Sequence, residues 1–467
     1  MVTIGQAFSV QTGEEAMASS LIGKQAIVVG AGMGGLAAAG AIARHFEQVV
    51  VVERDALPAE PTHRPGIPQG QHPHGLLISG QRALGALFPD FEQDLVRAGA
   101  VPIVSGLDLY WENPGYDPFP RRDLGLAAYA LSRPAIEHAV RRRVEGLANV
   151  RLRQRCRVEE LLATPDGATV TGVRCDNGNG SRETLEADLV IDASGRGALT
   201  LALLKSTGRP LPEETTIGVD LRYATCVFAI PDDAPTDWKG VMTFGGQAQQ
   251  SARGGLIYPL EGNRWMANLG GRHGDDPPDD PEGFLAFARG LRTPTIYNAI
   301  RHAKPLGGIA RYGFPESVLR HFERLETFPR GLLPTADAIC RFNPVYGQGM
   351  SVAAQEACLL GRLLEGLAET RDPIGGLAPA FFAEVPALLE TPWAVATSDF
   401  IHPSTRGKRP ADFETRIKFG MALTRLAAED PAVHRLTAEV SNLLKPRSVY
   451  RDDPALMQRV SATMAQM

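Results

Sequence analysis

The feature that most constrains the fold lies near the N-terminus, where residues 25–55 read QAIVVGAGMGGLAAAGAIARHFEQVVVVERD. This stretch combines an apolar strand, a glycine turn, a helix of small residues and a second strand that ends in an acid. Gly30 allows the tight turn, Gly32 lets backbone amides approach a pyrophosphate, and Gly35 lets the helix pack closely on the sheet. The arrangement predicts a parallel βαβ unit that binds a dinucleotide.

Glu53 ends the second strand, 18 residues after Gly35. That spacing is close to the value of about 20 expected for a carboxylate that accepts hydrogen bonds from the adenosine ribose. The N-terminus of the helix adds a partial positive charge that faces the phosphates. Because FAD and NAD share this fingerprint, other segments must separate them.

A second glycine-rich stretch, FNPVYGQGMS at 342–351, directly precedes VAAQEACLLGRLLEGLAE, whose apolar residues have helical spacing. A proline and two glycines are more than a simple turn needs. The pattern predicts a loop that cradles a ligand at a helix N-terminus. Our hypothesis is that the two glycine-lined helix starts converge on opposite ends of one coenzyme.

Three further segments have ligand-binding character. RPGIPQGQHPHGLL begins at Arg64, LSRPAIEHAVRRRV places Ser132 and Arg133 just before a helix, and EADLVIDASGRGALT is an apolar strand that runs into a small-residue turn containing Ser194. A later strand ends at Asp337, shortly before the second glycine loop.

In this arrangement, across roughly residues 24–370, the chain resembles the flavoprotein monooxygenases of the p-hydroxybenzoate hydroxylase fold class. The resemblance implies an α/β fold: a Rossmann-like FAD-binding domain, a discontinuous antiparallel-sheet substrate domain and a C-terminal helical region. It implies that Arg64 contacts the pyrophosphate, that Arg133 and Asp337 contact the ribityl region, and that the second glycine loop wraps the isoalloxazine ring. The cofactor contacts it implies are Gly30, Gly32, Met33, Gly35, Glu53, Arg54, Arg64, Arg133, Val158, Ser194, Asp337, Pro344, Gly347, Gly349 and Met350.

The domain boundaries follow from these segments. We expect a loose tail at 1–22, an FAD-binding domain from 23–108, 130–205 and 315–376, a β-rich substrate domain from 109–129 and 206–314, and a helical region at 377–467. Alternation in 215–230 and the two halves of 254–271 about the turn EGN predict antiparallel strands with an apolar interior above the flavin. GGRHGDDPPDDPEG at 270–283 is interpreted as a solvent-facing loop.

More narrowly, the chain looks most like bacterial epoxidases that act on polyene precursors of polyether ionophores. That likeness implies insertion of one oxygen atom from O₂ into an apolar alkene through a flavin C4a-hydroperoxide, in secondary metabolism. Two alternatives stay open: an aromatic hydroxylase on the same scaffold, and an FAD-dependent dehydrogenase or reductase without oxygen transfer. Epoxidation needs no side-chain base, and the sequence assigns no catalytic residue.

The chain departs from the family pattern at Ser194-Gly195, where the hydroxylase branch has Asp-Gly. NAD(P)H is therefore expected as electron source either directly or through a separate flavin reductase. Halogenation is disfavoured because the WxWxIP signature of flavin halogenases is absent. His72 and His74 lack further ligands at usable spacing, so we expect pocket wall and no metal. Tyr346 could touch the substrate or stack beside the ring.

Composition excludes several partners. A net charge of −5 and a pI near 6.1 provide no field for nucleic acid or anionic lipid. Five well-separated cysteines without a CxxC pair indicate free thiols in a reducing compartment. From these thiols we expect a cytoplasmic protein. No stretch reaches the roughly 18 apolar residues of a membrane span.

Overall fold

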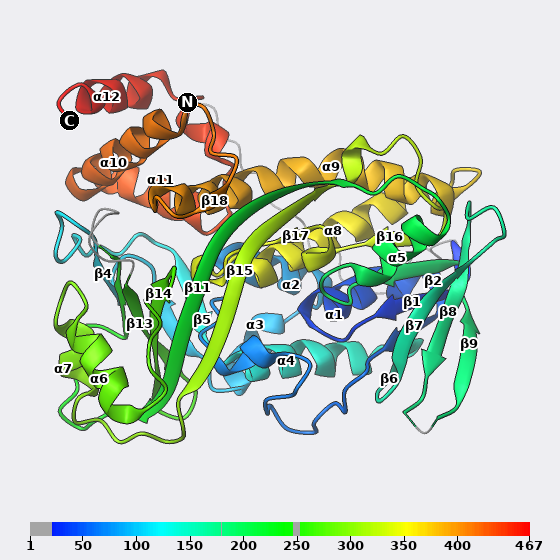
Figure 1. Ribbon diagram of the computed structural model, residues 1–467, viewed down its shortest axis with the longest axis horizontal. Coiled ribbons are helices and arrows are strands. Elements are labelled where there is room, and N and C mark those ends of the chain that lie inside the picture. The colour runs from blue at the N-terminus through cyan, green and yellow to red at the C-terminus, as the bar shows by residue number, and fades with distance from the viewer. Residues whose placement is uncertain (1–20, 179, 246–252) are drawn as a thin grey trace.

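The computed structural model describes residues 21–178, 180–245 and 253–467, and Figure 1 shows their arrangement. Most of the expected tail at 1–22 therefore lies outside the described residues. Two large sheets dominate, one parallel and one mainly antiparallel, and the helices of the C-terminus lie at one end of the molecule. The expected mixed α/β fold is confirmed.

The parallel sheet has the strand order β16-β10-β1-β2-β6. In its central register Ile27 pairs with both Val50 and Val190. Because every pair is parallel, the carboxyl ends of the strands meet at one edge, where ligands of open α/β sheets bind. The strands are β1 Gly23–Val29, β2 Phe46–Val52, β6 Val150–Arg153, β10 Leu189–Asp192 and β16 Leu332–Pro334.

Both faces of this sheet are covered, which explains the continuous apolar runs AIVV in β1, VVVV in β2 and LVI in β10. The helices on one face are α1 Met33–Ile42, α2 Ile78–Leu87, α4 Arg133–Glu145, α8 Gly349–Leu367 and α9 Pro373–Ala396, with α3 Phe91–Arg97 beside them. The other face carries β7 Arg157–Ala163, β8 Val170–Asp176, β9 Arg182–Glu186 and α5 Ala198–Ser206. The expected boundary at 377 falls inside α9, whose Leu377 and Phe381 pack into the core of the parallel sheet.

The second sheet has the order β17-β15-β11-β14-β13-β12-β4, with β18 paired to β11. It is antiparallel except where β4 runs parallel to β12. The predicted hairpin about EGN is confirmed as β13 and β14. The long strands β11 and β15 cross the molecule diagonally in Figure 1. The strands are β4 Leu109–Glu112, β11 Glu213–Ala229, β12 Gly240–Thr243, β13 Gly254–Leu260, β14 Arg264–Arg272, β15 Ala310–His321, β17 Cys340–Arg341 and β18 Arg406–Gly407.

Strand β11 contributes to two apolar clusters. Cys226 and Phe228 pack against helices α6 (Pro281–Arg289) and α7 (Thr295–Ile300), whereas Leu221 and Tyr223 pack in a second cluster with Phe400. The face opposite Cys226 and Phe228, which receives the loop around His72, carries hydroxyl and amide groups such as Thr225. An apolar interior above the flavin stays a prediction. The stretch interpreted as a loop at 270–283 also runs into α6, which the sequence analysis did not predict.

The C-terminal helices build a separate core. Helices α10 Phe413–Glu429, α11 Pro431–Ser441 and α12 Pro454–Met464 pack around Phe119. Phe119 lies in the connection between β3 Val101–Val104 and β5 Ala127–Ala130, which pair with each other. Among the described helices, none combines the length and apolar character that a membrane crossing requires. The five cysteines are free thiols, as predicted.

Candidate cofactor-binding site

Helices α1 and α8 begin side by side at the carboxyl edge of the parallel sheet. A Cβ placed on Gly34 would lie 3.7 Å from the Cβ of Ala353, and further along a Cβ on Gly361 would lie 3.6 Å from the carbonyl oxygen of Ala41. The two helices therefore run parallel, with both N-termini at the same end. Their partial positive charges add at this edge. The two glycine-lined helix starts thus lie together, and their contact with one coenzyme stays a prediction.

The glycines at these helix starts differ in what surrounds them. A Cβ on Gly35 would lie 1.8 Å from the carbonyl oxygen of Gly30, so Gly35 is needed for close packing. Gly32, the N-cap of α1, has no atom within 4 Å of such a Cβ, and the same holds for Gly349 at the start of α8. Open space in front of two helix N-termini is what a pyrophosphate and a flavin ring require, so these residues fit FAD.

The second glycine loop is held in a fixed turn. Asn343 accepts a hydrogen bond from the amide of Val345 at 3.1 Å, and Pro344 starts the short 3₁₀ helix η5, Pro344–Tyr346. Gly347 has φ 65°, a left-handed conformation that favours glycine. A Cβ on it would lie 3.7 Å from the carbonyl oxygen of Gly75. The loop that begins at Arg64 therefore lies against the loop that precedes α8, where Met350 is buried.

Asp337 lies on a short turn, η4 Ala336–Ala338, that contacts the start of α1. A Cβ placed on Gly34 would lie 2.8 Å from the Cβ of Ala336. Among the described residues the Asp337 carboxylate has no hydrogen-bond or ion-pair partner. Burial raises the pKa of Asp337, while the charges of Arg341 and Arg133 oppose the rise. This is an acceptor placed beside the helix N-terminus and left available for a ligand hydroxyl.

Glu356 fixes the turn that carries Asp337, a role the sequence analysis missed. Its buried carboxylate accepts hydrogen bonds from the Thr335 hydroxyl at 2.7 Å and from the Ala336 amide at 2.6 Å. Burial raises its pKa to about 7. An acid within the apolar face of a predicted helix, QEACLL, was the signal that could have revealed it.

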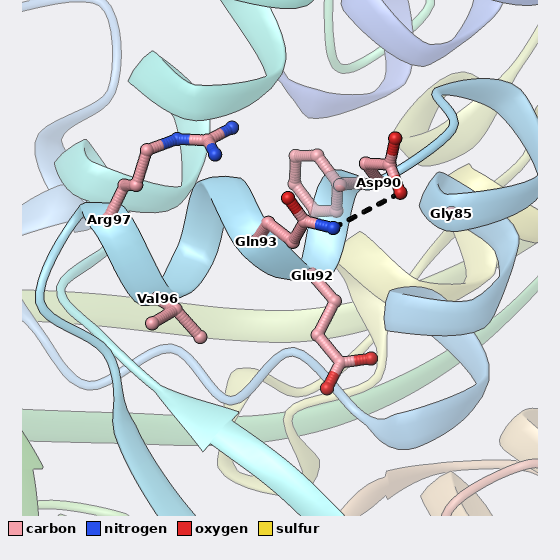
Figure 2. Close-up of a pocket in the computed structure, with 7 residues that line it drawn as sticks. Gly85, Asp90, Glu92, Gln93, Val96 and Arg97 are labelled. Carbon is pink, nitrogen blue, oxygen red and sulfur yellow. Dashed lines mark hydrogen bonds between the residues drawn. The ribbon is translucent and has the colours of Figure 1, made fainter.

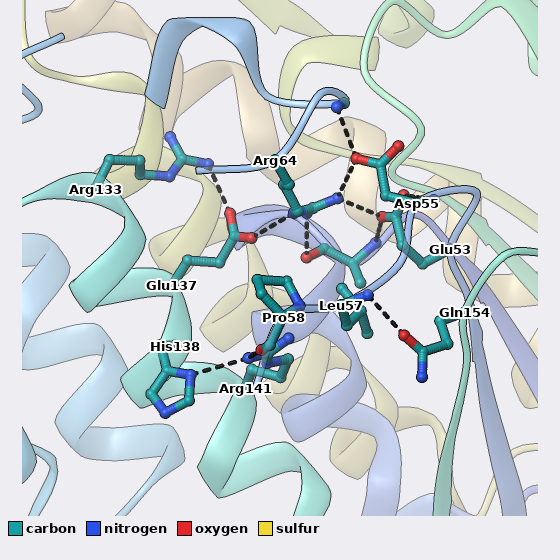
Figure 3. A network of polar contacts seen from close by, with 12 residues as sticks. Glu53, Asp55, Leu57, Pro58, Arg64, Arg133, Glu137, His138, Arg141 and Gln154 are labelled. Carbon is teal, nitrogen blue, oxygen red and sulfur yellow. Dashed lines mark hydrogen bonds and ion pairs between the residues drawn. The ribbon is translucent and has the colours of Figure 1, made fainter. Parts of the chain in front are cut away.

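A charged network surrounds the glycine turn (Figure 3). Glu53 is buried and accepts from the amides of Ala31 at 2.8 Å and Asp55 at 2.9 Å. Arg64 forms an ion pair with Glu53 at 3.2 Å and with Asp55 at 3.1 Å. Its Nε donates to Glu137 at 2.9 Å. Glu53 therefore holds the turn in addition to the ribose contact predicted for it.

Arg64 is almost wholly engaged with protein acceptors. Besides its three carboxylate partners, its Nη2 donates to the carbonyl oxygen of Ala31 at 2.9 Å. Burial lowers its pKa, but the carboxylates of Glu137 and Glu53 more than offset this, so its pKa is raised. The structure gives Arg64 a part in fixing the glycine turn, and its contact with the pyrophosphate stays a prediction.

The remaining arginines differ in their availability. Arg133, the first residue of α4, is buried and lies 3.5 Å from Glu137, but its Nε has no partner within the described part of the chain. Its charge acts on both Asp337 and His74. Arg54 is exposed and faces Asp55 at 3.9 Å. Arg133 thus has a free donor near the turn of Asp337.

Other predicted contacts have structural partners of their own. The Ser194 hydroxyl donates to Asp192 at 2.5 Å. Asp192 is completely buried and also accepts from the amide and hydroxyl of Thr200 at 3.1 and 2.7 Å, so it fixes the start of α5. Met33 is buried at the start of α1, and Val158 lies on β7 opposite Cys175. Their contacts with a flavin stay predictions.

His72 and His74 join the loop to the second sheet. A ring nitrogen of His72 lies 2.7 Å from the Thr225 hydroxyl, and its ring meets that of Tyr223 edge-on at 4.6 Å. The His74 ring nitrogen lies 2.9 Å from the His72 carbonyl oxygen. Burial lowers the pKa of His72 to about 4 and that of His74 to about 3. Both rings are therefore neutral near pH 7.

A hollow of about 710 Å³ lies elsewhere, on the surface between α2 and α3 (Figure 2). Its polar side chains have partners within the protein: Gln93 donates to Asp90 at 3.3 Å, and Glu92 accepts from the hydroxyl of Tyr129 at 2.6 Å. None of its lining residues comes from the glycine loops, so it is not part of the candidate site. The hollow is lined by Gly85, Asp90, Phe91, Glu92, Gln93, Val96 and Arg97.

Comparisons with known proteins agree with this geometry. No protein-family model matches the chain. The chain is 34% identical over 348 residues to Protein Rv3254 of Mycobacterium tuberculosis, which is 73% of each chain. Its fold matches the myxobacterial chondrochloren halogenase CndH, an FAD-dependent halogenase, with a TM-score of 0.61 and 18% identity over 95% of this chain and 97% of the other. It also matches PqsL, a probable FAD-dependent monooxygenase from Pseudomonas aeruginosa, with a TM-score of 0.58 and 18% identity over 80% and 96%. The chain therefore has the fold of FAD-dependent halogenases and monooxygenases.

Proposed function

The chain belongs to the family of Protein Rv3254, and we propose that it is an FAD-dependent monooxygenase that inserts one oxygen atom of O₂ into an apolar alkene. The observation that carries the proposal is the parallel start of α1 and α8 at the carboxyl edge of the parallel sheet, with open space at Gly32 and Gly349. The likeness of the fold to FAD-dependent proteins supports the same cofactor.

The chain's own residues divide the work of binding. With FAD bound, the backbone amides at Gly32 would face the pyrophosphate. Glu53 would accept hydrogen bonds from the ribose hydroxyls, and Asp337 would accept one from a ribityl hydroxyl. The loop from Pro344 to Gly349 holds the ring end, where the N-terminus of α8 stabilises negative charge. FAD, when bound, supplies the redox chemistry and the activation of O₂.

The two histidines beside the site favour an alkene over a phenol. Hydroxylation of a phenol usually gains from a base that takes the phenolic proton, whereas epoxidation of an alkene requires none. Their pKa values of about 4 and about 3 make His72 and His74 weak bases. The substrate that we propose is an apolar compound with an electron-rich double bond, in keeping with a role in secondary metabolism.

NAD(P)H is the proposed source of electrons, with a separate flavin reductase as the intermediary. The sequence contains one dinucleotide fingerprint, and Ser194 stands where the hydroxylase branch has the acid of its Asp-Gly pair. Ser194 is also bonded to Asp192. Adding a reductase to the assay, or leaving it out, separates the two routes.

Isotope transfer tests the reaction. The FAD-loaded protein is supplied with NADPH, a flavin reductase and ¹⁸O₂, together with a panel of styrene, squalene and a linear polyene. We expect an epoxide with one labelled oxygen and O₂ consumption equal to product. Labelled phenols without epoxide would assign hydroxylation instead, and brominated products with added bromide would assign halogenation. Substrate oxidation without label would assign a dehydrogenase.

Asp337→Asn tests the cofactor site itself. The substitution keeps the size of the side chain but removes a charged acceptor, so we expect the Kd for FAD to rise about tenfold. The apoprotein should not lose stability, because the half-buried carboxylate that it loses has no partner among the described residues. Titration of the apoprotein with FAD, followed by flavin fluorescence, measures the change. Asp176→Asn, at the end of β8, is the matched control, and equal Kd values for the two variants would contradict the assignment.

A further inference from the structure

Asp399 is a completely buried carboxylate beneath the second glycine loop. It lies on the short 3₁₀ helix η6, Thr397–Ile401. Its Oδ2 accepts from the side-chain amide of Asn343 at 2.9 Å, and its Oδ1 accepts from the hydroxyl of Tyr346 at 2.7 Å. Both donors precede Gly347, one at each end of the segment 343–346, so one carboxylate holds both ends of that segment.

A third partner comes from the antiparallel sheet. Arg272, the last residue of β14, places its Nη1 2.7 Å from Oδ1 of Asp399. Burial lowers the pKa of Arg272, but the Asp399 carboxylate and the Tyr346 oxygen more than offset this and raise it. The buried negative charge is therefore paired, and it joins the sheet to the loop.

The chain after Asp399 continues this connection. The Thr405 hydroxyl donates to the backbone oxygen of Asp399 at 2.7 Å. The next two residues, Arg406 and Gly407, form β18 and pair with Gly218 and Ile217 of β11. Arg406 also forms an ion pair with Asp220 of β11. We call residues 397–407 the strap, since they contact both β11 and the loop before α8.

We propose that Asp399 is a positioning residue that sets the conformation of residues 343–348 and ties them to the antiparallel sheet. The loop that holds the flavin ring then stays in a fixed position relative to the antiparallel sheet. The inference rests on the proposed function, because that function places the flavin ring at this loop. It also assigns the shape of the loop to one residue, which lies in the C-terminal part of the chain.

Substitution of Tyr346 tests the proposal more specifically than substitution of Asp399. Tyr346→Phe removes only the hydroxyl, which also lies 2.9 Å from the Ser398 hydroxyl, and leaves Asp399 paired with Arg272. Asp399→Asn removes the charge as well and leaves Arg272 buried without it. The first variant therefore tests the link between loop and strap with little risk to folding, and the second tests its charge.

Titration of the full-length apoprotein with FAD measures the effect. We expect the Kd for FAD to rise about fivefold in Tyr346→Phe and about tenfold or more in Asp399→Asn. We also expect a shift in the visible flavin spectrum, which a general loss of stability would not produce. Tyr450→Phe is the matched control, because Tyr450 is equally a tyrosine in the C-terminal part but lies in the core of α10–α12. It should bind FAD as the wild type does.

Hydrogen exchange of the apoprotein tests whether Asp399 holds the loop when no cofactor is present. We expect the amides of 343–350 to exchange about tenfold faster in Tyr346→Phe than in the wild type or in Tyr450→Phe. Unchanged exchange, or unchanged Kd and spectrum in both variants, would overturn the proposal. A wild-type chain that takes up no FAD would overturn the proposed function instead, and the exchange rates would still decide whether Asp399 holds the loop.

Discussion

Gly32→Ala is expected to weaken FAD binding at least about 100-fold while the free energy of unfolding of the apoprotein stays within about 1 kcal/mol of the wild type. Gly32 has φ −80° and ψ −176°, which alanine adopts without strain. A Cβ there has no protein atom within 4 Å. The methyl group therefore disturbs little in the protein, yet it fills the space in front of α1 into which a pyrophosphate must fit.

Substitutions of two other glycines serve as controls for Gly32→Ala. Gly85→Ala adds the same methyl group to open space in the last turn of α2, beside the surface hollow of Figure 2, and should leave FAD binding unchanged. Gly35→Ala places its methyl group 1.8 Å from a backbone oxygen and should lose both stability and binding. Fluorescence titration with FAD and urea unfolding measure the two quantities. Wild-type affinity in Gly32→Ala would show that no ligand approaches this helix.

The local motifs could be predicted from the sequence because each is formed by one continuous stretch of residues. The turn at Gly30, the helix that begins at Gly349 and the hairpin of β13 and β14 each follow from a short stretch of residues. Helix α6 was also readable in principle. Asp280 caps it by accepting from the amide of Gly283 at 2.7 Å, a signal that lay at the end of the stretch interpreted as a loop.

The side-chain networks were not readable, because their members are far apart in the chain. Nothing in the sequence around Tyr346 or Arg272 indicates that both meet Asp399. Arg64 was assigned to the pyrophosphate by likeness, but its preference for Glu53 and Glu137 depends on which carboxylates the fold brings to it. Pairing of this kind is decided by tertiary packing and not by local pattern.

The turn at Asp337 has a strained residue whose support depends on pH. Ala336 has φ 55°, a left-handed conformation that costs a non-glycine residue about 1 kcal/mol. Its amide donates to Glu356 at 2.6 Å, and the other carboxylate oxygen of Glu356 has no partner within the described ranges. Burial raises the pKa of Glu356 from 4.5 to about 7. Near neutral pH the Glu356 carboxyl group is therefore partly protonated and partly ionised.

Glu356→Gln is therefore expected to change how stability depends on pH. Because the folded-state pKa of Glu356 is raised, its contribution is fully present below pH 4.5 and is lost as pH rises through about 7, a loss of roughly 3 kcal/mol. The glutamine variant lacks this loss, so its stability relative to the wild type should increase by that amount between pH 4 and pH 8. Urea unfolding of the apoprotein across this range measures the difference. Glu365→Gln, an exposed site on the same helix, should run parallel to the wild type, and a parallel profile for Glu356→Gln would mean that Glu356 stays ionised in the folded protein.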